Sequence, residues 1–141
     1  MSQLYGYIFC GRKNGLRMVS TCVGDEMHEI GARMVADLFE VNGWDTRYLG
    51  ANVPIASLLT LLDRCSADVL AVSATLVSHV TAVRDLVSAV RGSASGARVR
   101  ILVGGYPFLL APELWRKVGA DGTGIDAHEA LEAARGILGQ G

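Results

Sequence analysis

The chain has 141 residues, half of them apolar, with 13 basic and 14 acidic side chains and a formal net charge of −1. This length suits one domain with a real core, and the balanced charge gives no electrostatic case for binding nucleic acid or an anionic membrane surface. The three cysteines lack metal-ligand spacing. The sequence has no apolar run near the ~20 residues that span a bilayer and no secretory signal. These features together predict a cytoplasmic protein with reduced thiols.

Residues 1–16 are predicted to form an N-terminal extension, and residues 17–141 a single domain. The extension holds a short apolar stretch at 4–10, followed by an Asn14-Gly15 pair that favours a hairpin turn. Two interpretations stay open for it: an extra edge strand paired with the first core strand, or a leader segment.

From residue 17 onward, apolar strand patterns alternate with amphipathic helix patterns. In the first helix, Ile30, Met34 and Leu38 recur at helical spacing and share one face. A continuous apolar run at 69–72 is typical of a strand that is covered on both faces. The predicted strands are 18–23, 45–49, 68–73, 99–103 and a short fifth strand that follows 119–122. The predicted helices are 30–42, 54–64, 77–91, one near 111–118, and 127–138.

Strands that alternate with helices form parallel sheets with right-handed crossovers. Five such units predict an α/β, flavodoxin-like (Rossmann-like) fold: a five-stranded parallel sheet of order 2-1-3-4-5 with helices on both faces. The switch point of this order lies between the first and third strands, where open α/β sheets bind their ligands. The loops that follow these strands, 24–31 and 73–78, are therefore expected to lie together in space.

The first of these loops places His28 between Glu26 and Glu29. One interpretation is structural, because carboxylates are favourable near the positive start of a helix. The other is metal binding, because a neutral imidazole is a good ligand for a transition metal and a carboxylate on its second nitrogen fixes its tautomer. No Ser-His-Asp order, Cys-x-x-Cys pair or phosphate loop accompanies it, so no complete catalytic site is predicted.

Several stretches, in one consistent order along the chain, make the sequence similar to the cobalamin (vitamin B12)-binding domain family. Two substitutions depart from the family pattern: Glu26 stands where the family has Asp, and Thr75 stands where its Ser-x-Leu stretch has Leu. The resemblance covers about residues 17–138. The stretches that carry it are Glu26-x-His28-x-x-Gly31, Asn42-Gly43-Trp44 followed by Tyr48-Leu49-Gly50, Ser73-Ala74-Thr75, Val103-Gly104-Gly105 and Gly119-Ala120-Asp121-Gly122.

The resemblance implies that cobalamin binds with its lower base swung away from cobalt and His28 as the lower axial ligand. Glu26 would orient His28, Ser73 and Thr75 would contact the buried nucleotide tail, and Tyr106 would form a lid. A purely structural interpretation stays open for Ser73 and Thr75, which could be ordinary polar groups at a strand end. The residues expected to bind the cofactor are Glu26, Met27, His28, Glu29, Ile30, Gly31, Ser73, Thr75, Val103, Gly104, Gly105, Tyr106, Gly122 and Thr123.

The motif version Glu-x-His-Glu-Ile-Gly-Ala is most similar to that of cobalamin-dependent photoreceptor regulators, which implies a role in sensing light or cobalamin. The alternatives are the cobalamin subunit of an adenosylcobalamin mutase or the carrier of a corrinoid methyltransferase system. A further alternative is a domain that binds haem, or one that binds no cofactor and serves in protein interaction. The adenosyl, methyl and hydroxo forms of cobalamin all stay open. A partner protein or domain is expected to cover the upper corrin face, a homo-oligomer is compatible with the sequence, and direct contact with nucleic acid or a membrane is not expected.

Overall fold

The computed structural model describes residues 15–23, 29–94, 98–111, 113–124 and 126–139, with the backbone alone at 29–31. Residues 1–14 of the predicted extension at 1–16, and the loop with Glu26, Met27 and His28, lie outside these residues. Within the described part, no helix has both the length and the apolar character needed to cross a bilayer.

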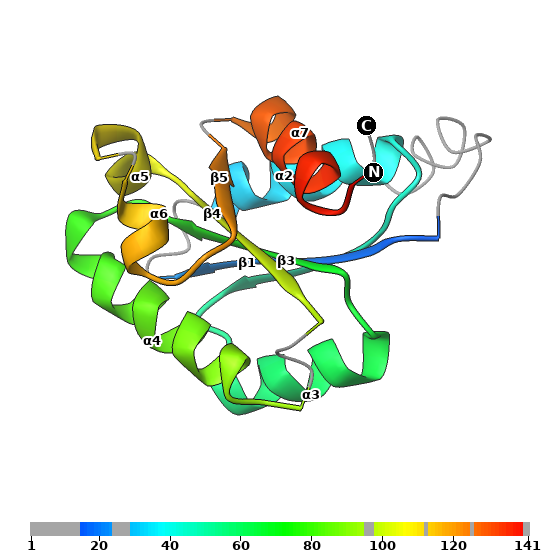
Figure 1. Ribbon diagram of the computed structural model, residues 1–141, viewed down its shortest axis with the longest axis horizontal. Helices are drawn as coiled ribbons and strands as arrows, with labels where there is room; N and C mark the ends of the chain where they lie inside the picture. The colour runs from blue at the N-terminus through cyan, green and yellow to red at the C-terminus, as the bar shows by residue number, and fades with distance from the viewer. Residues whose placement is uncertain (1–14, 24–28, 95–97, 112, 125, 140–141) are drawn as a thin grey trace.

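The five strands form one sheet in which every neighbouring pair is parallel, and their order is β2-β1-β3-β4-β5. This confirms the predicted flavodoxin-like topology (Figure 1). The strands are β1 (Arg17–Val23), β2 (Asp45–Ala51), β3 (Val69–Ala74), β4 (Arg100–Gly104) and β5 (Gly122–Gly124).

The helices cover both faces of the sheet, as Figure 1 shows: α2 and α7 lie on one face, and α3 and α4 on the other. The helical elements are α2 (Glu29–Val41), α3 (Ile55–Cys65), the 3-10 turn η2 (Val77–His79), α4 (Val80–Arg91), α5 (Tyr106–Leu110), α6 (Leu114–Lys117) and α7 (Ala127–Ile137).

The segment between β4 and β5 differs from the sequence prediction. A single helix near 111–118 was expected, but two short helices occupy 106–110 and 114–117. The first begins directly after Gly105, and Pro107 lies in its first turn, where a missing N–H leaves no helical hydrogen bond unmade. Tyr106 therefore belongs to a helix rather than to a loop.

Side chains alternate between two core layers, because successive residues of a strand point to opposite faces. On the α2/α7 face, Met18 of β1 packs with Phe39 and Trp44, whose rings meet edge-on at a centroid distance of 4.8 Å. On the α3/α4 face, Val19 packs with residues such as Leu58. The face that the side chain of each strand residue occupies therefore follows from its parity.

Candidate functional site

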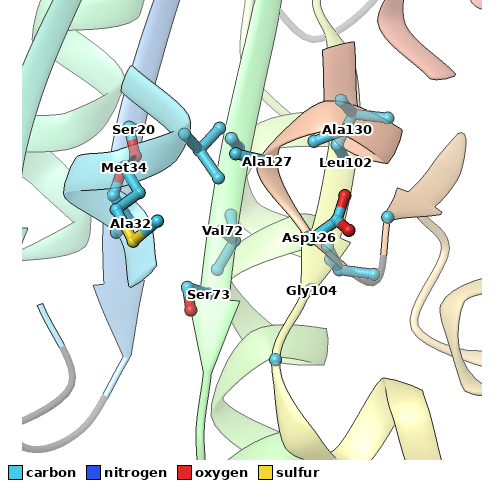
Figure 2. A pocket seen from close by; sticks show the side chains of 15 residues that line it. Ser20, Ala32, Met34, Val72, Ser73, Leu102, Gly104, Asp126, Ala127 and Ala130 are labelled. Atoms are coloured by element: carbon cyan, nitrogen blue, oxygen red, sulfur yellow. Dashed lines mark hydrogen bonds between the residues drawn. The ribbon is translucent and has the colours of Figure 1, made fainter. Parts of the chain in front are cut away.

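A cavity of about 200 Å³ lies between the sheet and the α2/α7 layer, towards the carboxyl ends of the central strands. In Figure 2, Ala32 and Met34 of α2 flank it on one side, and Ala127 and Ala130 of α7 flank it on the other. Among the residues that the structure describes, the lining consists of Ser20, Ala32, Met34, Val35, Ala71, Val72, Ser73, Leu102, Val103, Gly104, Gly105, Gly124, Asp126, Ala127 and Ala130.

The cavity exists because the side chains on this face become smaller towards the carboxyl ends of the strands. Strand pairing aligns Cys22, Ser73, Gly104 and Gly124 in one row across β1, β3, β4 and β5. None of these four residues is large enough to fill the space beneath α2 and α7.

One row further in, the register aligns Ser20, Ala71 and Leu102. All three line the cavity and form its inner end. The next row holds Met18 and Val69, which are fully buried and close the space. The result is a slot that is open at the carboxyl edge and shut at mid-sheet.

The slot walls are mostly apolar, and polar side chains enter the lining at Ser20, Ser73 and Asp126. Ser20 is 1% exposed, and its hydroxyl donates to the Ala32 carbonyl of α2 at 2.9 Å. Asp126 caps α7 by accepting a hydrogen bond from the Glu129 amide at 2.8 Å. Ser73 is half-buried at the edge of the slot, and no hydrogen bond joins its hydroxyl to another of the described residues.

The structure brings some predicted site residues together and keeps others apart. Ser73, Val103, Gly104 and Gly105 all line the slot. Glu29, Ile30 and Gly31 form the start of α2. Their side chains, like Glu26, Met27 and His28 as a whole, lie outside the described residues, so the axial-ligand prediction remains a prediction.

Four further predicted residues lie outside the slot lining. Thr123 points to the other face of the sheet, where its hydroxyl donates to the Val103 carbonyl at 2.7 Å. Gly122 is buried beneath α7. Tyr106 is 53% exposed at the start of α5, and Thr75 follows β3 in a half-buried position.

Sequence reasoning missed most of the slot walls. Ser20 lies inside an apolar strand pattern that predicts only a strand residue at this position, although its parity with Met18 places it on the α2/α7 face. Asp126 directly precedes the last predicted helix, and an aspartate at this position is a recognisable N-cap signal. The small residues Ala32, Ala71, Ala127 and Ala130 carry no signal of their own, because an alanine fits almost any buried position.

Taken together, fold and slot define an open α/β domain with a narrow, largely apolar slot beside its switch point, and such a slot suits a flat, largely apolar ligand group. The lower nucleotide of cobalamin fits this description, because its aromatic base suits apolar walls and its polar groups can meet the Ser73 hydroxyl at the slot edge. The small residues of the outer row leave the width that a flat ring system needs.

Comparison with known proteins identifies the family. The B12 binding domain family matches residues 16–133. The chain therefore belongs to the B12-binding domain family, and cobalamin is its cofactor. This result favours cobalamin over the haem-binding and cofactor-free alternatives.

Individual relatives agree with this assignment. The chain is 29% identical over 128 residues to dimethylamine corrinoid protein 3 of Methanosarcina acetivorans, a match that covers 90% of this chain and 58% of the relative. The chain thus spans a little over half the length of this curated relative.

Solved structures support the fold. A cobalamin-binding protein from Desulfitobacterium hafniense superimposes with a TM-score of 0.79 at 19% identity, over 88% of this chain and 60% of that one. The methanol:cobalamin methyltransferase complex of Methanosarcina barkeri gives a TM-score of 0.74 at 19% identity, over 89% and 47%. The named relatives are corrinoid and cobalamin proteins, and none is described as a photoreceptor, so the expected likeness to photoreceptor regulators is not supported.

Proposed function

We propose that this chain is the corrinoid-carrying domain of a methyl-transfer system. The sequence interpretation preferred a sensing role and kept methyl transfer as its alternative. The alternative is now preferred, because a relative matched over most of this chain is a dimethylamine corrinoid protein. The single structural observation that supports the proposal is the slot beside the switch point, which suits the nucleotide tail of a corrinoid bound with its base away from cobalt.

In this proposal the chain holds the cofactor from below. The tail enters between α2 and α7, with Ser73 as a hydrogen-bonding group at the edge of the slot. His28 immediately precedes Glu29, the first residue of α2, and its imidazole would ligate cobalt from beneath the corrin. The Glu26 carboxylate would accept a hydrogen bond from the N–H of the second ring nitrogen and so hold the ring in the correct tautomer.

Cobalamin, when bound, supplies a cobalt atom that can accept and release a methyl group, which is chemistry the side chains lack. The chain contributes position and shielding. Its apolar slot excludes water from the lower base, and the lower ligand leaves the upper face of the corrin to a partner. The proposed partner is a methyltransferase, and the proposed substrates are methylated amines or methanol.

The ligand proposal is tested with purified protein and hydroxocobalamin. We expect wild type to bind it and to give a visible spectrum with a protein nitrogen as lower ligand. His28→Ala should shift this spectrum towards the form without that nitrogen. His128→Ala serves as the control, because His128 is exposed on α7 on the outer side of the domain. A His28→Ala spectrum identical to that of wild type would mean that His28 is not on cobalt.

A second experiment separates methyl transfer from sensing. The protein loaded with hydroxocobalamin is first reduced to the Co(I) state with a strong chemical reductant such as titanium(III) citrate, because only Co(I) can accept a methyl cation. It is then incubated with a methylamine or methanol methyltransferase and a donor that carries a labelled methyl group. Label that co-elutes with the loaded protein supports the carrier role. A light-induced spectral change with an altered oligomeric state, and no transfer of label, would favour a sensor instead.

A further inference from the structure

Ser20 provides a polar atom at the closed end of the slot. It stands in the inner row with Ala71 and Leu102, one row deeper than Ser73 and Gly104. Of the three polar side chains in the described lining, Ser20 is the most deeply buried, since Ser73 is half-buried and Asp126 is exposed. A group that reaches the end of the slot therefore meets the Ser20 oxygen among apolar neighbours.

The hydrogen bonding of Ser20 determines what this oxygen can offer. Its hydroxyl hydrogen is committed to the Ala32 carbonyl at 2.9 Å. A hydroxyl has one hydrogen and two lone pairs, so the oxygen that remains for a ligand is an acceptor. At 1% exposure, water does not reach it once a ligand fills the slot.

Burying a hydrogen-bond acceptor without a donor makes the binding free energy less favourable, whereas a hydrogen bond to that acceptor makes it more favourable. The end of the slot should therefore discriminate between lower bases by what they carry at their far edge. A base with a hydroxyl or amino group can donate a hydrogen bond to the Ser20 oxygen. A base with methyl groups removes water from this oxygen and supplies no hydrogen bond in its place.

We propose that Ser20 is a specificity-determining residue that favours cobamides whose lower base carries a hydrogen-bond donor at its far edge. The inference rests on the proposed function, because it requires the lower base to occupy the slot. It goes further by naming the class of corrinoid that this chain prefers and the side chain that selects it.

The test compares two probes: cobalamin, whose base is dimethylbenzimidazole, and the cobamide with 5-hydroxybenzimidazole in its place. Dissociation constants are measured by spectral titration for wild type, Ser20→Ala and Thr21→Val. Thr21 is a matched control, because it is 2% exposed and its hydroxyl also donates to a carbonyl, that of Gly50 at 3.0 Å. It points to the opposite face of the sheet and does not line the slot.

We expect wild type and Thr21→Val to bind the hydroxy cobamide roughly two- to tenfold more tightly, the effect of one net hydrogen bond. Ser20→Ala should abolish this preference, mainly by weakening the hydroxy cobamide. Circular dichroism of both variants checks that the fold is retained.

Equal affinities in wild type, or an unchanged preference in Ser20→Ala, would overturn the role of Ser20 while cobalamin binding in the slot survives. Absence of binding of either probe to folded wild type would overturn the proposed function, and this inference with it. A preference lost equally in Thr21→Val would also contradict the proposal, since it would trace the effect to a general loss of buried hydrogen bonding.

Discussion

Gly105 lies where the chain leaves β4 and passes closest to the end of β3. Its φ is 109°, a conformation that side chains rarely adopt. A Cβ atom built there would come within 1.7 Å of the Ala74 carbonyl oxygen. A glycine is therefore required here because the backbones of two strand ends approach each other closely. The absence of a side chain also leaves room at the edge of the slot.

At this scale we predict that Gly105→Ala lowers the free energy of unfolding by about 2 kcal/mol or more, from positive φ and steric conflict together. Urea denaturation followed by circular dichroism measures the change. Gly92→Ala is the control, because its Cβ would meet neighbours at ordinary distances of 3.6 Å and beyond. Equal stability losses in the two variants would contradict the explanation.

At the scale of elements, the slot depends on how closely α7 packs against β5. A Cβ at Gly124 would lie 2.5 Å from the Ala130 amide nitrogen, which belongs to the helix backbone. Helix and strand are therefore almost in contact at this point. The position of α7 fixes Ala127 and Ala130, which form one wall of the slot.

We predict that Gly124→Ala pushes α7 away from the sheet, lowers stability by about 1–3 kcal/mol, the typical cost of overpacking, and weakens cobalamin binding. Gly136→Ala adds the same methyl group within α7 itself, at a position where a Cβ would meet nothing within 4 Å. It should raise stability by about 0.5–1 kcal/mol, because alanine favours the helix. Thermal unfolding and spectral titration of both variants provide the comparison, and normal binding by Gly124→Ala would argue against this wall.

At the scale of the whole molecule, the proposed function links cofactor binding to the stability of the fold, because the cofactor would occupy a slot that only the folded chain forms. A ligand that binds only the folded state stabilises it, by about 2.7 kcal/mol at a concentration of one hundred times Kd. For a chain of this size we expect saturating cobalamin to raise Tm by about 5–10 °C.

Ser73→Leu should abolish this thermal shift, because its side chain would fill the outer row of the slot, while the apoprotein keeps a Tm close to that of wild type. Ser57→Leu makes the same change at an exposed position on α3, on the other face of the sheet. It should keep the full shift. A Ser73→Leu protein that cobalamin still stabilises normally would mean that the tail does not use this slot.

The sequence by itself determined the topology and the edge of the sheet at which the slot opens. Alternating strand and helix patterns require a parallel sheet, and this in turn brings the ends of the first and third strands together. The motif stretches predicted Ser73, Gly104 and Gly105 beside one another, and strand pairing aligns the first two. These predictions succeeded because they depend on local periodicity and on chain order, which the sequence carries directly.

Only the tertiary structure decided how deep the slot is and what lies at its end. Ser20, Ala71 and Leu102 become neighbours through the register of three strands, and alternation along one strand gives the face of a residue but not its partner in the next strand. Likewise, Gly124 and Ala130 meet because α7 docks on β5. Cavities form where side chains from distant segments fail to fill a space, so their shape depends on packing between elements and is not encoded in any one stretch of the chain.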